Sequence, residues 1–385
     1  MSGRSVLLGA GASAEAGIPT VREMSRRLLA ALPEWDNSRA LLAFVMGGLM
    51  FRAGARGEDP NAGVDVEELF TAVEALASRD TVEMAPFVAG WHPMVERVER
   101  MGRSRRPPEG RLSEGLKKAI TGVVADAVGG HHISDTAIRQ FARDLVEVID
   151  PGSRSAFASL SQEMVQALRG ILNIPDVAAV SYLKPLIELS RSQGALSIAS
   201  LNYDRSVEII GQEMGLSIAT GIEAWATEGH LDFPEAAIKL LKLHGSIDWV
   251  EEDRWPEPSE QKLPVPVVRP MVSADVNAAK PAVIFGGGNK LRADGPYLDL
   301  LRTFGDELVG IGQLVIVGYS FRDDHVNTVI RTWFNTNETR TIVVVNPSFA
   351  QLPSLFAQQL RQFAGARITV IPKGAKEGLP LALGV

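Results

Sequence analysis

Three short segments place polar side chains directly after apolar runs, and these side chains are the ones whose types could do chemistry. They read SLNYD at 200–204, KLHGS at 242–246 and GYSFRDDH at 318–325. An open α/β sheet binds its ligands at the carboxyl ends of its strands, which is where such segments would lie. A carboxylate there could stabilise positive charge, and a histidine could accept a proton near neutral pH.

The same residues also have ordinary structural explanations. Asn202 and Asp204 could cap the helix expected at 206–214, since Asn and Asp are favoured at helix N-termini. His244 could be a hydrogen-bonded core histidine, with the Gly-Ser that follows it forming only a turn. The residues alone leave both interpretations open.

A glycine-rich segment near the N-terminus has the form of a phosphate-binding turn. The sequence at 5–20, SVLLGAGASAEAGIPT, runs from a short apolar strand into a turn with Gly9 and Gly11. Glycines permit close approach of backbone N–H groups to a phosphate, and Ser13 could satisfy the first donors of a following helix. Ala14 stands where the third glycine of a dinucleotide fingerprint would be, so an ordinary strand-to-helix turn is the alternative.

A proline shortly after this turn should change the direction of the chain. Pro19 is expected to end the first helix after about two turns. We therefore expect Arg22 on a loop or a new helix over the ligand cleft, the alternative being a solvated surface charge.

Composition excludes several classes of protein. The chain has 385 residues, 45% of them hydrophobic, no cysteine and a formal net charge of −7. Its length predicts two lobes, and its charge gives no general reason to bind nucleic acid or an anionic membrane. The lack of cysteine excludes thiolate nucleophiles and cysteine-ligated zinc. No leader precedes the first strand, so we expect a cytoplasmic protein.

The elements that position the polar segments change character along the chain. Helical periodicity dominates as far as residue 194, whereas strands and helices alternate afterwards, which indicates a parallel sheet covered on both faces. We predict an α/β fold: a doubly wound, Rossmann-like parallel sheet from residues 1–24 and 195–385, with a helical insertion lobe at 25–194 and no zinc module. The candidate strands are 5–8, 196–201, 216–220, 238–243, 282–285, 314–319, 341–346 and 368–371, and the candidate helices among them are 206–214, 297–309 and 325–334.

Three features of the predicted lobe have ordinary structural explanations. The apolar run Ala40 to Phe51 is about half of the roughly 20 residues that a membrane helix needs, so it predicts a buried helix or a subunit contact. The basic segment Arg97–Lys118 reads as a solvated loop, with contact to nucleic acid or an acidic partner as the alternative. His131 and His132 lack further ligands at metal-binding spacing and indicate a surface turn.

Taken together, the glycine turn with GIPT and the three polar segments resemble the sirtuin NAD-binding domain. The resemblance is nearest to the bacterial sirtuin-like NAD hydrolases of antiphage defence, and the motifs occur in the same order. It implies that NAD⁺ is the substrate, that Asn202 and Asp204 face the nicotinamide ribose, and that His244 is the catalytic base. It also implies that the rest of the dinucleotide is held by Gly9, Ala10, Gly11, Ser13, Arg22, Gly318, Ser320 and Asn346.

One departure from the deacetylating sirtuins narrows the expected reaction. Those enzymes carry a four-cysteine zinc module after the catalytic histidine, whereas residues 250–281 are an acidic stretch followed by a proline-rich run. Without that module, water is a more plausible acceptor than acyl-lysine. The resemblance therefore implies a NAD⁺ glycohydrolase that forms nicotinamide and ADP-ribose, linear or cyclic, and depletes NAD⁺ in abortive infection.

Two alternatives and several partners stay open at this point. The chain could be a catalytically idle sensor that binds NAD⁺ or ADP-ribose, or it could be a protein deacylase or ADP-ribosyltransferase. The resemblance also implies a homo-oligomer without direct nucleic-acid contact, and a HerA-type ATPase or, less favoured, an Argonaute-type protein as partner.

Overall fold

The computed structural model describes residues 3–33, 37–77, 153–234, 237–254, 265–272, 281–283 and 295–384. The chain divides into two compact units, which we call the sheet unit (residues 1–20 and 172–385) and the helical unit (residues 21–171). The second boundary therefore lies before the 3₁₀ helix η4 (Val177–Leu183) and helix α9 (Lys184–Gln193), which the sequence had placed in the lobe. Helix α9 belongs with the sheet because it packs against η4 and strand β2.

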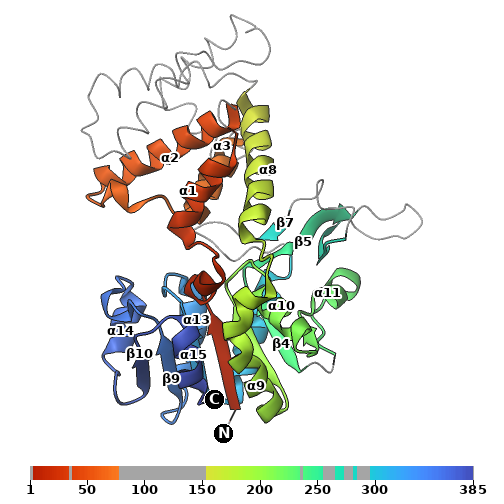
Figure 1. Ribbon diagram of the computed structural model, residues 1–385, viewed down its shortest axis with the longest axis vertical. Coiled ribbons are helices and arrows are strands. Elements are labelled where there is room, and N and C mark those ends of the chain that lie inside the picture. The colour runs from red at the N-terminus through yellow and green to blue at the C-terminus, as the bar shows by residue number, and fades with distance from the viewer. Residues whose placement is uncertain are drawn as a thin grey trace, which may run out of the picture. The chain divides into compact units, whose positions relative to one another are not determined.

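The sheet unit is built on seven parallel strands in the order β10-β9-β8-β1-β2-β4-β3 (Figure 1). Strand β1 lies between β2 and β8, so the chain crosses to opposite sides of the sheet at β1, the switch point where doubly wound folds bind ligands. The predicted fold class is confirmed. The strands are β1 (Gly3–Leu8), β2 (Leu196–Ser200), β3 (Ile218–Ala219), β4 (Ile238–Lys242), β8 (Ile311–Val317), β9 (Thr341–Val345) and β10 (Ile368–Ile371).

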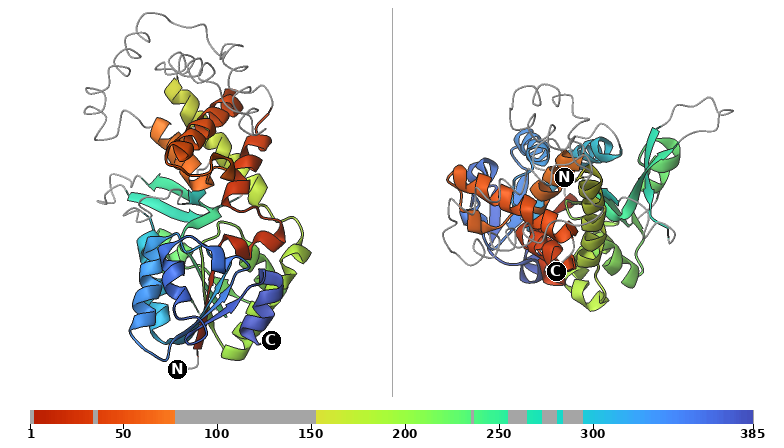
Figure 2. Two further views of the ribbon diagram at one scale, coloured as in Figure 1. Left: turned by 90° about the vertical axis from the view of Figure 1, so that its left-hand side faces the viewer. Right: turned by 90° about the horizontal axis from the view of Figure 1, so that it is seen from above.

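Helices cover both faces of this sheet (Figure 2, left). On one face, alternate strand residues such as Leu7 and Ile316, which are register partners, join Phe304 and Trp333 in the main core. These strands are apolar along most of their length because both faces are covered. One layer contains α12 (Tyr297–Val309) and α13 (Asp324–Asn335), with α14 (Leu355–Arg361) in the same core; the other contains α9, α10 (Ser206–Glu213) and α15 (Ala375–Leu383).

A second, three-stranded antiparallel sheet follows β4, and sequence reasoning missed it. It consists of β5 (Gly245–Arg254), β6 (Val265–Pro270) and β7 (Pro281–Val283), in the order β6-β5-β7. The prediction that 282–285 joins the parallel sheet is therefore wrong, since β7 pairs antiparallel with β5. The prolines of β6 argue against a strand when the sequence is considered alone. They are tolerated here because β6 lies at the edge of its sheet. Helix α11 (Ile222–Glu228) packs against β6.

The helical unit, as far as the structure describes it, contains α1 (Val21–Ala31), α2 (Asn37–Ala55), α3 (Val66–Ala77) and α8 (Ser153–Leu172). The apolar run from Ala40 to Phe51 lies within α2, which contacts α1 and α3. No helix in the described ranges combines the length and the hydropathy needed to cross a bilayer. The segment Arg97–Lys118 and the pair His131 and His132 lie outside the described residues.

Candidate functional site

The glycine turn after β1 packs backbone to backbone against the loop after β8. The Gly9 N–H donates to Val317 O at 2.9 Å, and the Gly11 N–H donates to Gly318 O at 2.9 Å. A Cβ at Gly9 would lie 2.6 Å from Tyr319 Cα, and one at Gly318 would lie 2.3 Å from the Ala12 nitrogen. Both loops therefore need glycine in order to meet at the switch point.

The turn does not lead into the single helix that the sequence predicted. It continues as two 3₁₀ helices, η1 (Ala10–Ala12) and η2 (Ala14–Ala16), which end at Gly17 in the left-handed conformation, with φ of 81°. Gly11, Gly17 and the short side chains between them provide little to stabilise a longer helix. Ser13 does not cap the segment; its hydroxyl instead accepts a hydrogen bond from Asn202 Nδ2 at 2.9 Å.

Asn202, which follows β2, is tied to the glycine turn. Its Nδ2 donates to Gly9 O as well as to Ser13 Oγ, both at 2.9 Å, and its own N–H donates to Ser200 Oγ at 3.1 Å. The structure thus brings together two residues that the sequence predicted from segments far apart in the chain. A cavity beside them is lined in part by Ser13, Asn202, Asp204, Ser206, Glu208 and Lys242.

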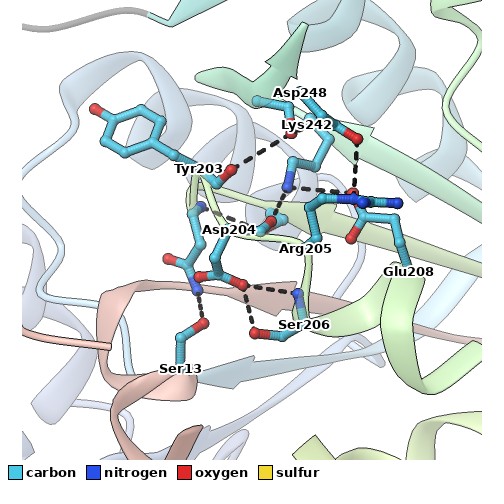
Figure 3. Close-up of polar contacts among 11 residues, drawn as sticks. Ser13, Tyr203, Asp204, Arg205, Ser206, Glu208, Lys242 and Asp248 are labelled. Carbon is cyan, nitrogen blue, oxygen red and sulfur yellow. Dashed lines mark hydrogen bonds and ion pairs between the residues drawn. The ribbon is translucent and has the colours of Figure 1, made fainter. Parts of the chain in front are cut away.

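Asp204 is fixed by the start of the following helix (Figure 3). Its Oδ1 accepts hydrogen bonds from the N–H of Ser206, at 2.9 Å, and from the Ser206 hydroxyl. The contact fixes Asp204 beside the first turn of α10, whose N-cap residue is Arg205 rather than Asp204. Burial raises the pKa of Tyr182, and the negative charges of Asp204 and Glu15 raise it further. The Tyr182 hydroxyl donates to Ala12 O at 2.6 Å.

A buried lysine contacts the loop that carries Asp204, and sequence reasoning did not single it out (Figure 3). Lys242, the last residue of β4, is 1% exposed; its ammonium donates to Asp204 O and lies 3.4 Å from Glu208 Oε1. Burial raises the pKa of Glu208, an effect that Lys242 opposes. The sequence offered only a weak signal, a lysine at the end of an apolar strand, because a charge there usually points to solvent and needs a partner only if it is buried.

His244 lies between β4 and β5 and is paired with a carboxylate. Its Nε2 is 2.9 Å from Asp323 Oδ2, and its ring centroid is 6.4 Å from that of Tyr203. The residue after it, Gly245, has φ of 83°, and a Cβ there would lie 2.0 Å from Ala282 O in β7. The second sheet thus fixes the path of the chain immediately after the histidine.

Asp323, the partner of His244, begins helix α13. Its Oδ1 accepts from the N–H groups of His325 at 3.0 Å and Val326 at 3.1 Å. The residue Phe321 just before it has φ of 58°, a left-handed conformation that is costly for a bulky side chain. Packing against Tyr319, Phe349 and Phe356 holds it there.

Three other residues predicted to bind the dinucleotide are not hydrogen-bonded to Asn202 or His244 in the part of the chain that the structure describes. Asn346, after β9, is buried; its Nδ2 donates to Tyr319 O at 3.1 Å and its Oδ1 accepts from the Ser348 N–H at 2.8 Å. Ser320 is exposed. Arg22 lies in the helical unit, in the new helix expected after Pro19, and its Nη1 donates to Ala62 O at 3.1 Å.

A comparison with protein-family models finds similarity to a known domain in the second half of the chain. Residues 196–371 match a SIR2-like domain. The match covers a little less than half of the chain and supports a relationship of this segment to sirtuin-like proteins. It runs from the first residue of β2 to the last residue of β10, so it includes Asn202, His244, Asp323 and Asn346 but leaves the glycine turn outside. No curated protein matches the chain.

The SIR2-like domain indicates the general chemistry of the site. Such domains use NAD, so the match implies NAD-dependent enzyme activity in general. Within the described residues, no cluster of three or more His, Cys, Asp and Glu side chains could hold a metal ion.

Proposed function

We propose that this chain is a NAD⁺ glycohydrolase, which cleaves NAD⁺ to nicotinamide and ADP-ribose. The observation that carries the proposal is the hydrogen bonding of Asn202 to both Gly9 and Ser13, because it joins a SIR2-like segment to the glycine turn at the switch point. A dinucleotide lying across the carboxyl ends of the strands would meet both segments.

The reaction needs positioning more than covalent help. Nicotinamide is bonded to the ribose through a cationic ring nitrogen, so it leaves as a neutral molecule. As that bond breaks, positive charge develops on the ribose, and water then adds to the same carbon. The products are nicotinamide, ADP-ribose and one proton. Rigid side chains that hold the ribose and the water at one place would supply much of the rate.

In this proposal His244 accepts the proton from the attacking water or from a ribose hydroxyl. Asn202 orients the substrate, and its fixed amide makes that orientation rigid. Asp204 contributes a fixed negative charge to the developing cation, because Ser206 already holds one of its oxygens. A ribose or adenine atom in place of water would give a cyclic product.

Release of nicotinamide from NAD⁺ by the purified protein tests the proposal. The assay is run without any acceptor protein, and with and without a candidate activator. We expect His244→Ala and Asn202→Ala to lower turnover at least about 100-fold, the size of a general-base or positioning contribution. His230→Ala is the matched control, because His230 is exposed and, among the described residues, pairs with Glu228 alone.

Three results would contradict the proposal. Unchanged turnover in His244→Ala or Asn202→Ala would remove the assigned residues. Release of nicotinamide only when a protein acceptor is added would identify a deacylase or a transferase instead, whereas tight NAD⁺ binding without turnover under every condition would identify a sensor.

We extend the proposal to the wider role that the sirtuin resemblance implies. A cytoplasmic enzyme of this kind would deplete NAD⁺ during phage infection, as a homo-oligomer and together with a HerA-type ATPase. Measuring NAD⁺ in infected cells that express the wild type or His244→Ala, with and without such an ATPase, tests this role. Equal NAD⁺ levels in all four cases would count against it.

A further inference from the structure

His244 and Asp323 form a buried pair that distinguishes the two nitrogens of the imidazole. The Nε2–Oδ2 distance is 2.9 Å, and the side chains are 6% and 4% exposed. An ionised carboxylate can only accept hydrogen bonds, so Nε2 must carry the hydrogen. In a neutral imidazole the other nitrogen, Nδ1, then has the lone pair. Among the described residues Nδ1 makes no hydrogen bond.

In the part of the chain that the structure describes, the two oxygens of Asp323 have different partners. Oδ1 accepts the N–H groups of His325 and Val326 at the start of α13, and Oδ2 faces His244. Starting a helix requires only one side-chain oxygen, which serine or threonine supplies equally well. The second oxygen is therefore not explained by the helix.

The loop before Asp323 makes its position rigid. Its N–H donates to the Tyr319 hydroxyl at 3.1 Å, and Asn327 Nδ2 donates to Phe321 O at 3.0 Å. Phe321 keeps its left-handed conformation inside an aromatic cluster and is 1% exposed. A strained backbone persists only when its surroundings over-determine it, so the carboxylate has little freedom to turn away.

We infer that Asp323 is a positioning residue, which holds His244 as the Nε2–H tautomer so that Nδ1 is the nitrogen that accepts the proton. The inference rests on the proposed hydrolase function. In the step, an O–H bond of water or of a ribose hydroxyl breaks, an Nδ1–H bond forms, and the resulting imidazolium is stabilised by the Asp323 carboxylate. The proton later passes to solvent, so the pair returns to its starting state.

The tautomer can be measured without any turnover. Nitrogen NMR of protein labelled with ¹⁵N-histidine distinguishes a protonated from an unprotonated ring nitrogen, and the difference between wild type and His244→Ala identifies the His244 signals among the 6 histidines of the chain. We expect Nε2 protonated and Nδ1 unprotonated in the wild-type protein. A protonated Nδ1 in the neutral ring would overturn the inference.

The variant Asp323→Asn reverses the contact while keeping the helix start. The asparagine oxygen can still accept from the two N–H groups, whereas its NH₂ group donates to His244 and makes Nε2 the acceptor. We expect the NMR pattern of His244 to invert, and kcat to fall at least about 100-fold while KM changes less than about threefold. The control is Asp324→Asn, which changes an exposed neighbour in the same helical turn.

The other possible results of these experiments also support or overturn the role of Asp323. If kcat falls but the tautomer is unchanged, or if kcat stays within about twofold of the Asp324→Asn value, Asp323 does not act through the tautomer. Should Asp323→Asn fail to fold, Asp323→Ser keeps a helix-starting oxygen without the contact to His244, and the same loss of kcat is expected. A protein that hydrolyses no NAD⁺ but shows the expected NMR pattern would contradict the proposed function alone.

Discussion

The two ends of the seven-stranded sheet use polar side chains in different ways. At the amino ends of the strands, two arginines bond to carbonyls near the ends of helices: Arg340 Nη2 donates to Val309 O at 2.9 Å, and Arg367 Nη2 donates to Phe334 O at 2.6 Å. Cations are favoured at helix C-termini, so these contacts are fully accounted for by the fold.

At the carboxyl ends, by contrast, the polar side chains bond across loops that follow different strands. Asn202 bonds to the loop after β1, Lys242 to the loop after β2, and Asp323, after β8, to His244, after β4. All are buried. Burying such groups is costly unless each has a partner, and the partners here hold together four separate loops. The identity of the partner, rather than burial itself, therefore separates a structural polar group from a candidate functional one.

Strand β4 allows this comparison to be tested on one element, and the largest expected effect lies here. Lys242 is 1% exposed and its partner Glu208 is 16% exposed, whereas Lys239, near the amino end of β4, is 37% exposed and lies 2.8 Å from Glu307. Replacing Lys242 by methionine leaves Glu208 mostly buried and without this partner, which should lower the free energy of unfolding by about 3–5 kcal/mol. Lys239→Met should cost about 0–1 kcal/mol.

Urea unfolding of both variants measures the difference. Adding Glu208→Gln to Lys242→Met should recover part of the lost stability, because the unpaired carboxylate is removed. Equal losses for Lys242→Met and Lys239→Met would show that the two ends of β4 do not differ in this way.

The two ends of β1 offer a smaller contrast between glycines. A Cβ at Gly9 would meet backbone, Tyr319 Cα at 2.6 Å and Gly318 O at 2.7 Å, whereas a Cβ at Gly3 would meet only the end of the Ile311 side chain at 3.1 Å. Gly9→Ala should therefore destabilise the fold by about 1–3 kcal/mol, as overpacking does. Gly3→Ala should change it by less than about 0.5 kcal/mol.

Thermal unfolding of the two alanine variants checks this, and NAD⁺ binding adds a second measure. Gly9→Ala should also weaken binding, because it pushes the glycine turn away from the loop after β8. A greater loss of stability in Gly3→Ala than in Gly9→Ala would show that the close packing of the glycine turn against the loop after β8 does not limit the residue at position 9.

Much of the carboxyl end could be predicted from the sequence, for physical reasons. Apolar runs marked β2, β4, β8 and β9, and the segments that follow them had to share one edge because the strands are parallel. That reasoning found Asn202 and His244. It did not find Lys242, since a charge at the end of a strand usually points to solvent, and its partner Glu208 lies on a helix.

The parts that could not be predicted depend on contacts between distant residues. The sequence predicted Asp323 as a polar residue after β8. Its pairing with His244 could not be predicted, because it depends on where β4 and β8 lie, on opposite sides of β1. The small sheet was hidden because β7 spans only Pro281–Val283 and pairs with a strand some thirty residues away. Short strands of this kind are defined by their partners rather than by a pattern of their own.

The smallest predicted effect concerns pH and Glu208, the partly buried carboxylate beside Lys242. Burial raises the pKa of Glu208 above its ordinary value of 4.5. The folded protein therefore keeps a proton there at pH values where the unfolded chain has lost it. As a result, the free energy of unfolding falls as pH rises from about 4.5 to the folded pKa, by at most about 1.4 kcal/mol per pH unit.

Glu208→Gln removes this pH dependence. The stability of the variant relative to wild type should therefore rise with pH from about 4.5 to the folded pKa of Glu208 and then level off. Urea unfolding of both proteins from about pH 4 to 8 measures the difference. A difference that is constant over this range would mean that the carboxyl end of the sheet holds Glu208 no differently from a carboxylate in water.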